Sequence, residues 1–228
     1  MHILLIGASG RNGSLILQSA LSRDYTVTAL VRNPSASSLP SHPNLTLIAG
    51  SPTSQSDLEA ALQSPASPDA VIVALGHRRT GDSPFAPPAP DCPHDLMERT
   101  TRSLLDAIQA VGPSKQSKII VNSSQGVGAS LSSMFFALRL VFNYSKAMRM
   151  GLEDHAKVDA IVRESGLPFV LARPCRLSEA PAQSVRAWPD DGRGASWFAA
   201  VSRASVAEWL LDAVESSEFN GRAPVLTN

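Results

Sequence analysis

The stretch that decides the fold is ILLIGASGRNG, residues 3–13, which an amphipathic segment follows at Ser14–Leu21. A second apolar run, Val27–Val31, comes next. An apolar strand, a glycine-rich turn, a helix and another strand in this order are typical of the start of a dinucleotide-binding fold. The pattern therefore predicts a Rossmann-like α/β fold that binds NAD(P) near this end of the chain.

Each glycine of the turn has a physical role in such a site. Gly7 permits the tight turn out of the strand, Gly10 lets the backbone approach a pyrophosphate, and Gly13 lets the helix pack closely against the strand. The helix N-terminus adds N–H groups and a partial positive charge that favour a phosphate. The alternative is a glycine-rich turn in some other α/β protein.

The residue after the second strand favours NADP over NAD. NAD sites usually place Asp or Glu there to accept a hydrogen bond from the ribose 2′-hydroxyl, but no acidic residue occurs between Tyr25 and Ser56. Arg32 stands there instead, and a guanidinium can bind a 2′-phosphate through paired hydrogen bonds. Arg11, inside the glycine turn, is a second candidate for that phosphate. We therefore expect NADPH as the cofactor, the alternative being that Arg32 is a solvated surface charge.

The composition fits one compact domain over residues 1–228. Hydrophobic residues make up 43% of the chain, and 20 basic residues balance 20 acidic ones. We therefore expect no nucleic-acid partner and no membrane partner, because there is no basic patch and no apolar run of spanning length. Cys92 and Cys175 lack metal-ligand spacing, and the first strand begins too early for a signal peptide. Both features predict a cytoplasmic protein with reduced thiols and no bound metal. We also expect a monomer or a weak homo-oligomer.

The rest of the chain alternates apolar runs with amphipathic windows. We predict strands at 45–49, 70–75, 118–122 and 169–172, and helices at 56–62, 95–110, 134–150, 152–165 and 203–214, the last of which closes the chain. This alternation predicts a doubly wound parallel sheet, which binds ligands at the carboxyl ends of its strands.

Two regions interrupt the alternation. Residues 77–93 contain Pro84, Pro87, Pro88, Pro90 and Pro93, so they predict a stiff loop that is either a pocket wall or a surface excursion.

The second region has strand-like runs at 185–188 and 196–201 around the sequence DDGRG, and it predicts a β-hairpin. We expect a small substrate lobe built from residues 77–93, 125–150 and 175–202.

Candidate catalytic side chains follow the fifth strand. Ser123 and Ser124 come directly after it, and a hydroxyl there can hydrogen-bond a substrate carbonyl or the nicotinamide amide, unless it caps local backbone. His155 can exchange a proton near neutral pH, although a lone histidine is often only a surface residue. The Tyr-x-x-x-Lys pair of short-chain dehydrogenases is missing, because Met148 stands four residues after Tyr144. The enzyme therefore either needs no strong acid or is not a reductase.

The sequence resembles atypical short-chain dehydrogenases with NmrA-like NAD(P)H-binding domains, and among them the biliverdin-IXβ reductase or flavin reductase family. The resemblance rests on the glycine turn and on segments spread over most of the chain: LVRNP at 30–34, VIVALG at 71–76, Asp154-His155 with RESGL at 163–167, and DGRG at 191–194.

This resemblance implies roles for particular residues. The cofactor would contact Gly7, Ser9, Gly10, Arg11, Asn12, Gly13, Arg32, Leu75, Gly76 and Ser123. Ser124 would orient the acceptor, and His155 would lend it a proton or a hydrogen bond. Members of the family also lack the Tyr-x-x-x-Lys pair and pass hydride to flavins or linear tetrapyrroles, which need little acid help.

Three departures from the family leave the substrate open. Gly50-Ser51 stands where the family usually has Gly-Asp near the adenine, and the loop at 77–93 is longer than expected. The stretch 131–150 is unusually apolar and is equally compatible with core and with a hydrophobic pocket wall.

We therefore expect an NADPH-dependent reductase of a small, hydrophobic, conjugated acceptor, which is a flavin, quinone, tetrapyrrole or enone. The alternatives are a redox-neutral isomerase or cyclase on the same fold, and an NADP-binding sensor protein.

Overall fold

The computed structural model describes residues 1–36, 39–81, 83–112 and 117–228. Its elements in chain order are β1 (His2–Ile6), α1 (Arg11–Ser22), β2 (Thr26–Val31), η1 (Pro34–Ala36), β3 (Leu45–Ala49), α2 (Gln55–Leu62), β4 (Ala70–Val73), α3 (Leu96–Val111), β5 (Lys118–Asn122), η2 (Gly128–Ser133), α4 (Phe136–Tyr144), α5 (Lys146–Glu164), β6 (Phe169–Pro174), β7 (Arg176–Ser178), β8 (Arg186–Trp188), β9 (Ala200–Ser202), α6 (Arg203–Glu215) and β10 (Val225–Thr227).

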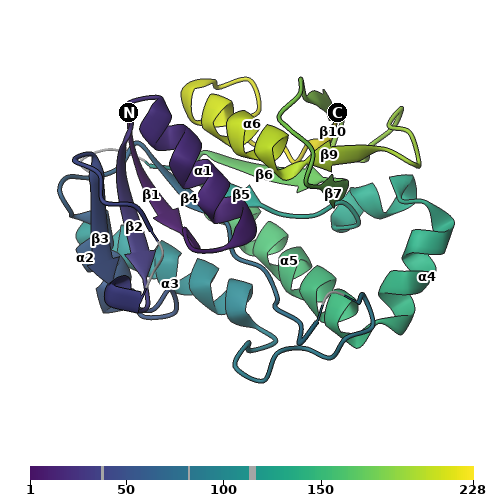
Figure 1. Cartoon of the computed structure of the whole chain (residues 1–228), viewed down its shortest axis with the longest axis horizontal. Helices are drawn as coiled ribbons and strands as arrows, with labels where there is room; N and C mark the ends of the chain where they lie inside the picture. Colours follow the sequence, from purple (N-terminus) through teal and green to yellow (C-terminus); the bar gives the residue numbers. More distant parts are fainter. Residues whose placement is uncertain (37–38, 82, 113–116) are drawn as a thin grey trace.

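A twisted sheet of eight strands forms the middle of the molecule, in the order β3-β2-β1-β4-β5-β6-β10-β8 (Figure 1). Neighbouring strands are parallel throughout except at the edge, where β8 runs antiparallel to β10. The strand order reverses between β1 and β4, which is the place where doubly wound sheets bind ligands. The predicted Rossmann-like α/β fold is confirmed.

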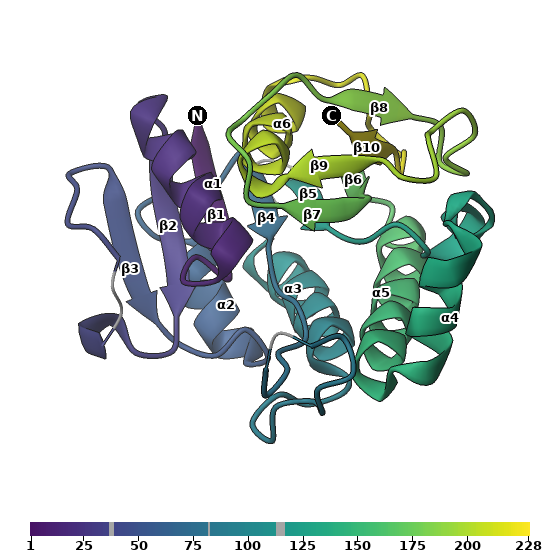
Figure 2. The same ribbon diagram turned by 45° about the vertical axis from the view of Figure 1, so that its right-hand side comes forward.

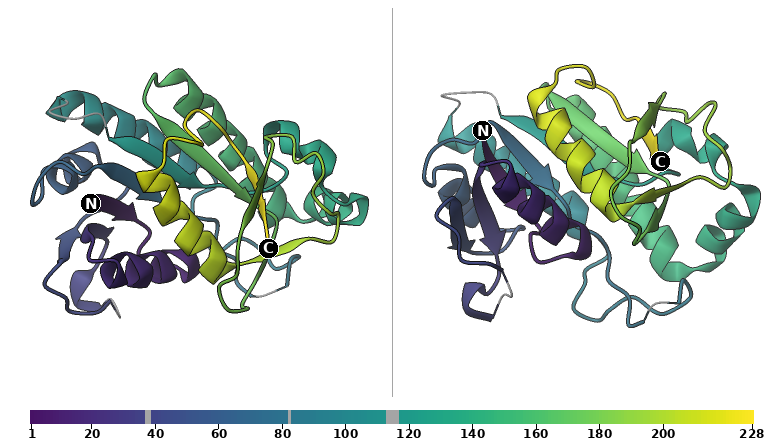
Figure 3. Two further views of the ribbon diagram at one scale, coloured as in Figure 1. Left: turned by 90° about the horizontal axis from the view of Figure 1, so that it is seen from above. Right: turned by 45° about the horizontal axis from the view of Figure 1, so that its top comes forward.

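Helices cover both faces of this sheet (Figure 3). On β1, Ile3 and Leu5 belong to the core shared with α1 and α6, whereas Leu4 and Ile6 belong to the core shared with α2, α3 and α5. All four side chains have 0% exposure. A strand buried on both faces reads as a continuous apolar run instead of an alternating one, which explains why ILLI marks this strand so clearly.

The glycine turn holds α1 against β1 at very short range. Gly7 has a φ of +95°, a conformation that side chains rarely adopt. A Cβ on Gly13 would lie 2.0 Å from the carbonyl oxygen of Gly7, so α1 approaches the turn more closely than any residue with a side chain would allow.

The helices after β5 divide at a different residue from the one expected. We predicted helices at 134–150 and 152–165, but α4 ends at Tyr144 and α5 begins at Lys146. Ser145 makes the boundary, because its hydroxyl accepts a hydrogen bond from the Met148 N–H at 3.2 Å and caps α5. Figure 2 shows α4 on the outer side of α5.

The predicted hairpin over residues 185–201 is wrong, and so is the expectation that a helix closes the chain. β8 pairs with β10 at the edge of the main sheet, and β9 pairs in parallel with β7 in a separate two-stranded sheet. β10 follows α6 and inserts between β6 and β8. Each of these strands has three residues, so its pairing is set by tertiary contacts that local sequence does not show.

The proline-rich segment 77–93 is a loop, as predicted, apart from residue 82, which lies outside the described residues. Its two ends meet, because the Ala89 N–H donates to the Arg78 carbonyl at 2.9 Å and Arg78 forms an ion pair with Asp91. The Ser145 hydroxyl donates to the Pro84 carbonyl and ties the loop to the start of α5.

We predict that Gly13→Ala lowers the free energy of unfolding by about 1–3 kcal/mol, because the methyl group must push α1 away from the Gly7 carbonyl. Gly76→Ala is the control, since a Cβ there meets nothing within 4 Å. Urea denaturation of both variants measures the difference. Equal stability of the two variants would show that the close approach of α1 is not a constraint.

Candidate functional site

A cavity of about 800 Å³ opens at the carboxyl ends of β1, β4, β5 and β6. Nine of the residues predicted for the site line it: Ser9, Gly10, Arg11, Asn12, Leu75, Gly76, Ser123, Ser124 and His155. Gly7, Gly13 and Arg32 are not among its lining residues. Gly7 and Gly13 shape the turn that carries Ser9–Asn12, and Arg32 directly follows β2. A second hollow of about 900 Å³, between β8 and α6, contains none of the predicted residues.

The glycine turn presents the N-terminus of α1 to this cavity. The Gly10 N–H donates to the Gly7 carbonyl at 3.0 Å, and the Ser14 N–H donates to the Gly10 carbonyl at 2.8 Å. Gly10 is the N-cap, and no side chain caps the helix there. This arrangement leaves the first helical N–H groups for an anion and fits the pyrophosphate of a dinucleotide.

Arg203, at the start of α6, adds a positive charge beside that helix end, and sequence reasoning missed it. Its Nη1 donates to Asn12 Oδ1 at 2.6 Å and its Nε donates to Glu179 Oε1 at 2.9 Å. Arg11 also pairs with Glu179. The hydrogen bond from Arg203 is the main reason that the pKa of Glu179 lies below its usual value. Nothing near Arg203 in the sequence marks it, because its partners are distant along the chain.

A carboxylate also stands near the end of β3, where the sequence has Gly50-Ser51. Asp57, in the first turn of α2, accepts a hydrogen bond from the Ser51 N–H at 2.8 Å. A Cβ on Gly50 would lie 2.7 Å from the Cβ of Asp57. The family resemblance implies an Asp directly after Gly50, at the end of β3. Here α2 instead brings the carboxylate of Asp57 next to that strand end.

His155 lines the cavity as a neutral imidazole. Burial lowers its pKa from 6.5 to about 4, and its Nδ1 is buried without a hydrogen-bond partner among the described residues. A neutral ring can offer a hydrogen bond but cannot serve as a strong acid near neutral pH. The Ser124 hydroxyl donates to the Gln125 carbonyl at 3.0 Å, so its proton is engaged locally while the residue faces the cavity.

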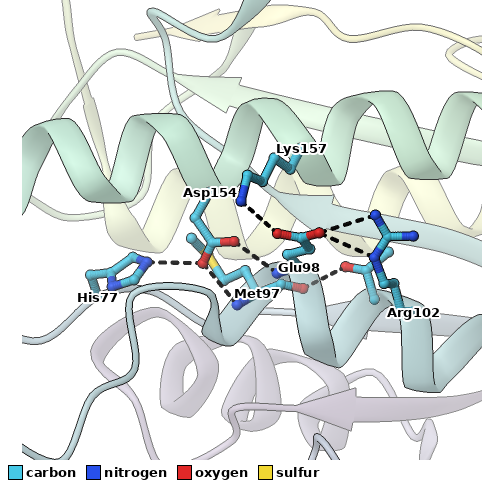
Figure 4. Close-up of polar contacts among 7 residues, drawn as sticks. His77, Met97, Glu98, Arg102, Asp154 and Lys157 are labelled. Atoms are coloured by element: carbon cyan, nitrogen blue, oxygen red, sulfur yellow. Dashed lines mark hydrogen bonds and ion pairs between the residues drawn. The ribbon is translucent and has the colours of Figure 1, made fainter.

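His77 is a further cavity residue, and Asp154 holds it in place (Figure 4). Their Nε2 and Oδ2 atoms are 2.9 Å apart. The same carboxylate accepts the N–H groups of Met97 at 2.9 Å and Glu98 at 2.8 Å, which caps α3. Burial alone would raise the pKa of Asp154, but the hydrogen bonds from His77 and from these backbone groups lower it. The carboxylate is therefore ionised and ties the proline-rich loop, α3 and α5 together.

The outer wall of the cavity is apolar. Met134, Leu138 and Phe142 line it, and they come from the end of η2 and from α4. Every residue of α4 is at least partly exposed, so this helix is not core. Both tyrosines are described and lie outside the lining: Tyr25 donates to Glu215, and Tyr144 is 79% exposed.

The described part of the chain contains no group of three or more His, Cys, Asp or Glu side chains able to hold a metal ion. Within the same residues, no helix has the length and apolar character needed to span a bilayer.

Comparison with solved structures supports this fold. The anaerobilin reductase ChuY from Escherichia coli O157:H7 superimposes with a TM-score of 0.74 at 19% identity, covering 100% of this chain and 97% of that chain. A short-chain dehydrogenase/reductase from Veillonella parvula, in complex with NADP, gives 0.76 at 19% identity over 100% and 94%. A candidate NADH-flavin reductase from Streptococcus pneumoniae gives 0.66 at 17% identity over 100% and 99%.

The family model described as NAD(P)H-binding matches residues 7–217, which span the glycine turn, the cavity and α6. The chain therefore belongs to the NAD(P)H-binding family.

Proposed function

We propose that this protein is an NADPH-dependent reductase that passes hydride to a conjugated hydrophobic acceptor, which is a flavin, quinone, tetrapyrrole or enone. The observation that carries the proposal is the composition of one cavity. It joins an anion-binding helix end to an apolar wall and has no tyrosine in its lining.

The cofactor end of the cavity is built for a phosphorylated dinucleotide. The N–H groups at the start of α1 would hold the pyrophosphate, with Arg203 adding positive charge. Arg32, exposed at the end of β2, would bind the 2′-phosphate. Leu75, Gly76 and Ser123 would border the nicotinamide, because they follow the neighbouring strands β4 and β5, whose carboxyl ends open into the cavity. The bound cofactor would supply a hydride.

The acceptor end suits a molecule that tolerates hydride without a strong acid. Ser124 and neutral His155 would orient the acceptor by hydrogen bonds, and Met134, Leu138 and Phe142 would cover its apolar face. A conjugated system spreads the added charge over several atoms, so a hydrogen bond is sufficient. The anaerobilin reductase and the candidate NADH-flavin reductase among the similar structures fit this class of acceptor.

We predict that NADPH binds at least about tenfold tighter than NADH, and that Arg32→Ala removes most of this preference, since a charge-assisted hydrogen bond contributes about 2 kcal/mol. Arg203→Ala is the matched comparison. It should weaken both cofactors by a similar factor, because the pyrophosphate is common to them. Titration calorimetry measures the affinity of the wild type and of each variant for NADPH and for NADH. Equal affinity of the wild type for the two cofactors would refute the role of Arg32.

We predict that the wild type oxidises NADPH with at least one acceptor from a panel of flavin, quinone, tetrapyrrole and enone. Ser124→Ala and His155→Ala should each lower kcat about tenfold, with little change in NADPH affinity, because each removes one hydrogen bond to the acceptor. Ser132→Ala, on the exposed side of η2, is the control. NADPH absorbance follows the reaction. Tight NADPH binding without oxidation by any acceptor would instead favour a redox-neutral enzyme or a sensor.

We predict that His155 makes the fold less stable in mild acid. The unfolded histidine takes up a proton below about pH 6.5, whereas the folded one does so only near pH 4. The free energy of unfolding should therefore fall as the pH drops through this window, by about 1–2 kcal/mol at about pH 5. His155→Gln should lose this component, while His94→Gln, which removes an exposed histidine, should retain it. The same acid sensitivity in both variants, measured by urea denaturation, would contradict the assignment.

A further inference from the structure

A carboxylate, an imidazole and a thiol lie in a row beside the cavity. Asp154 Oδ2 is 2.9 Å from His77 Nε2, and on the other side of the ring His77 Nδ1 faces Cys92 Sγ at 3.8 Å. The side chains of Asp154 and His77 are 1% and 5% exposed, and Cys92 is buried. His77 and Cys92 come from the two ends of the proline-rich loop, and Asp154 comes from α5.

The contacts of Asp154 decide which ring nitrogen carries the hydrogen. An ionised carboxylate only accepts hydrogen bonds, so His77 Nε2 must donate to it. In the neutral ring, Nδ1 then presents a lone pair toward the Cys92 thiol. The Arg78 N–H donates to Cys92 Sγ at 3.4 Å and holds the sulfur in place beside the ring. A nucleophile beside a base that a third group orients is the arrangement that activates a thiol.

We propose that Cys92 is a site of covalent addition by electron-poor alkenes, with His77 as its base and Asp154 as the residue that positions the imidazole. The thiol proton moves to His77 Nδ1, and the sulfur bonds to the β-carbon of the alkene. The alkene π pair shifts to the α-carbon, which takes the proton back from His77. An S–H bond and a π bond are replaced by C–S and C–H bonds, so nothing is oxidised or reduced and no other reactant is needed.

The second cysteine of the chain provides an internal comparison. Cys175 and Cys92 have the same exposure, 7%. Burial raises the pKa of Cys175 to about 11, which keeps it a protonated and unreactive thiol near neutral pH. A difference in reactivity between the two cysteines therefore does not follow from residue exposure alone.

The test is the rate at which a limiting amount of N-ethylmaleimide, an electron-poor alkene, labels each cysteine of the folded protein near neutral pH. Peptide mass mapping at successive times gives the two rates. We expect Cys92 to react at least about tenfold faster than Cys175. His77→Asn and Asp154→Asn should each slow labelling of Cys92 by a similar factor and leave Cys175 unchanged. Cys92→Ser should abolish the fast phase.

If His77 and Asp154 had only a structural role, the variants would label Cys92 faster instead of more slowly, because a loosened loop exposes buried thiols. Faster labelling in both variants, an unchanged Cys92 rate in His77→Asn, or equal rates for the two wild-type cysteines would overturn the proposal. If Asp154→Asn fails to fold because α3 loses its cap, the wild-type ratio and His77→Asn decide the matter.

Discussion

The close contact between the glycine turn and α1 is the constraint on which the rest of the structure depends. Because Gly13 lies against the Gly7 carbonyl, α1 begins directly above the end of β1. That position is the switch point of the sheet, because β2, which follows β1 in the chain, lies on one side of β1, and β4, which follows β3, lies on the other. The helix end, the ends of β4 and β5 and the start of α6 then enclose one cavity. A wider separation of α1 from β1 would displace the helix end that we propose to bind the pyrophosphate from the rest of the site.

The central part of the fold could be predicted because local sequence and burial agree there. β3 and β5 have the predicted bounds, and β1 begins one residue before its apolar run. The run is clear for β1 because a strand buried on both faces needs continuous apolar residues. The strands β7 to β10 could not be predicted in the same way. They are three residues long, and their partners lie elsewhere in the sequence, as Trp188 and Val225 illustrate.

The site could be predicted only in part, for a similar reason. Residues next to the glycine turn or directly after β4 and β5 line the cavity because the topology brings strand ends together. The contacts of Arg203, His77 and Asp154 join distant segments, so local sequence does not predict them. The protonation state of His155 could not be predicted from the sequence either, because burial in the folded protein lowers its pKa to about 4. The proposed role of His155 is therefore limited to hydrogen bonding.

The chemical character of the cavity follows from what these residues supply together. Positive charge and backbone N–H groups gather at one end, and apolar side chains gather at the other. The polar groups between them are neutral His155 and serine hydroxyls, which orient a molecule without protonating it strongly. These groups suit the proposed hydride transfer to a conjugated acceptor better than reduction of an isolated carbonyl, which needs a proton at the developing alkoxide.

The proposed hydride transfer is tested most directly by single-turnover oxidation of NADPH with an acceptor in excess. The NADPH carries deuterium at one or the other face of nicotinamide C4. A cofactor held in one orientation beside Ser124 and His155 should react more slowly with deuterium on one face only, because the C–H bond on that face breaks. Equal rates for the two labelled cofactors and the unlabelled one, or no oxidation at all, would contradict direct hydride transfer from a cofactor bound in this cavity.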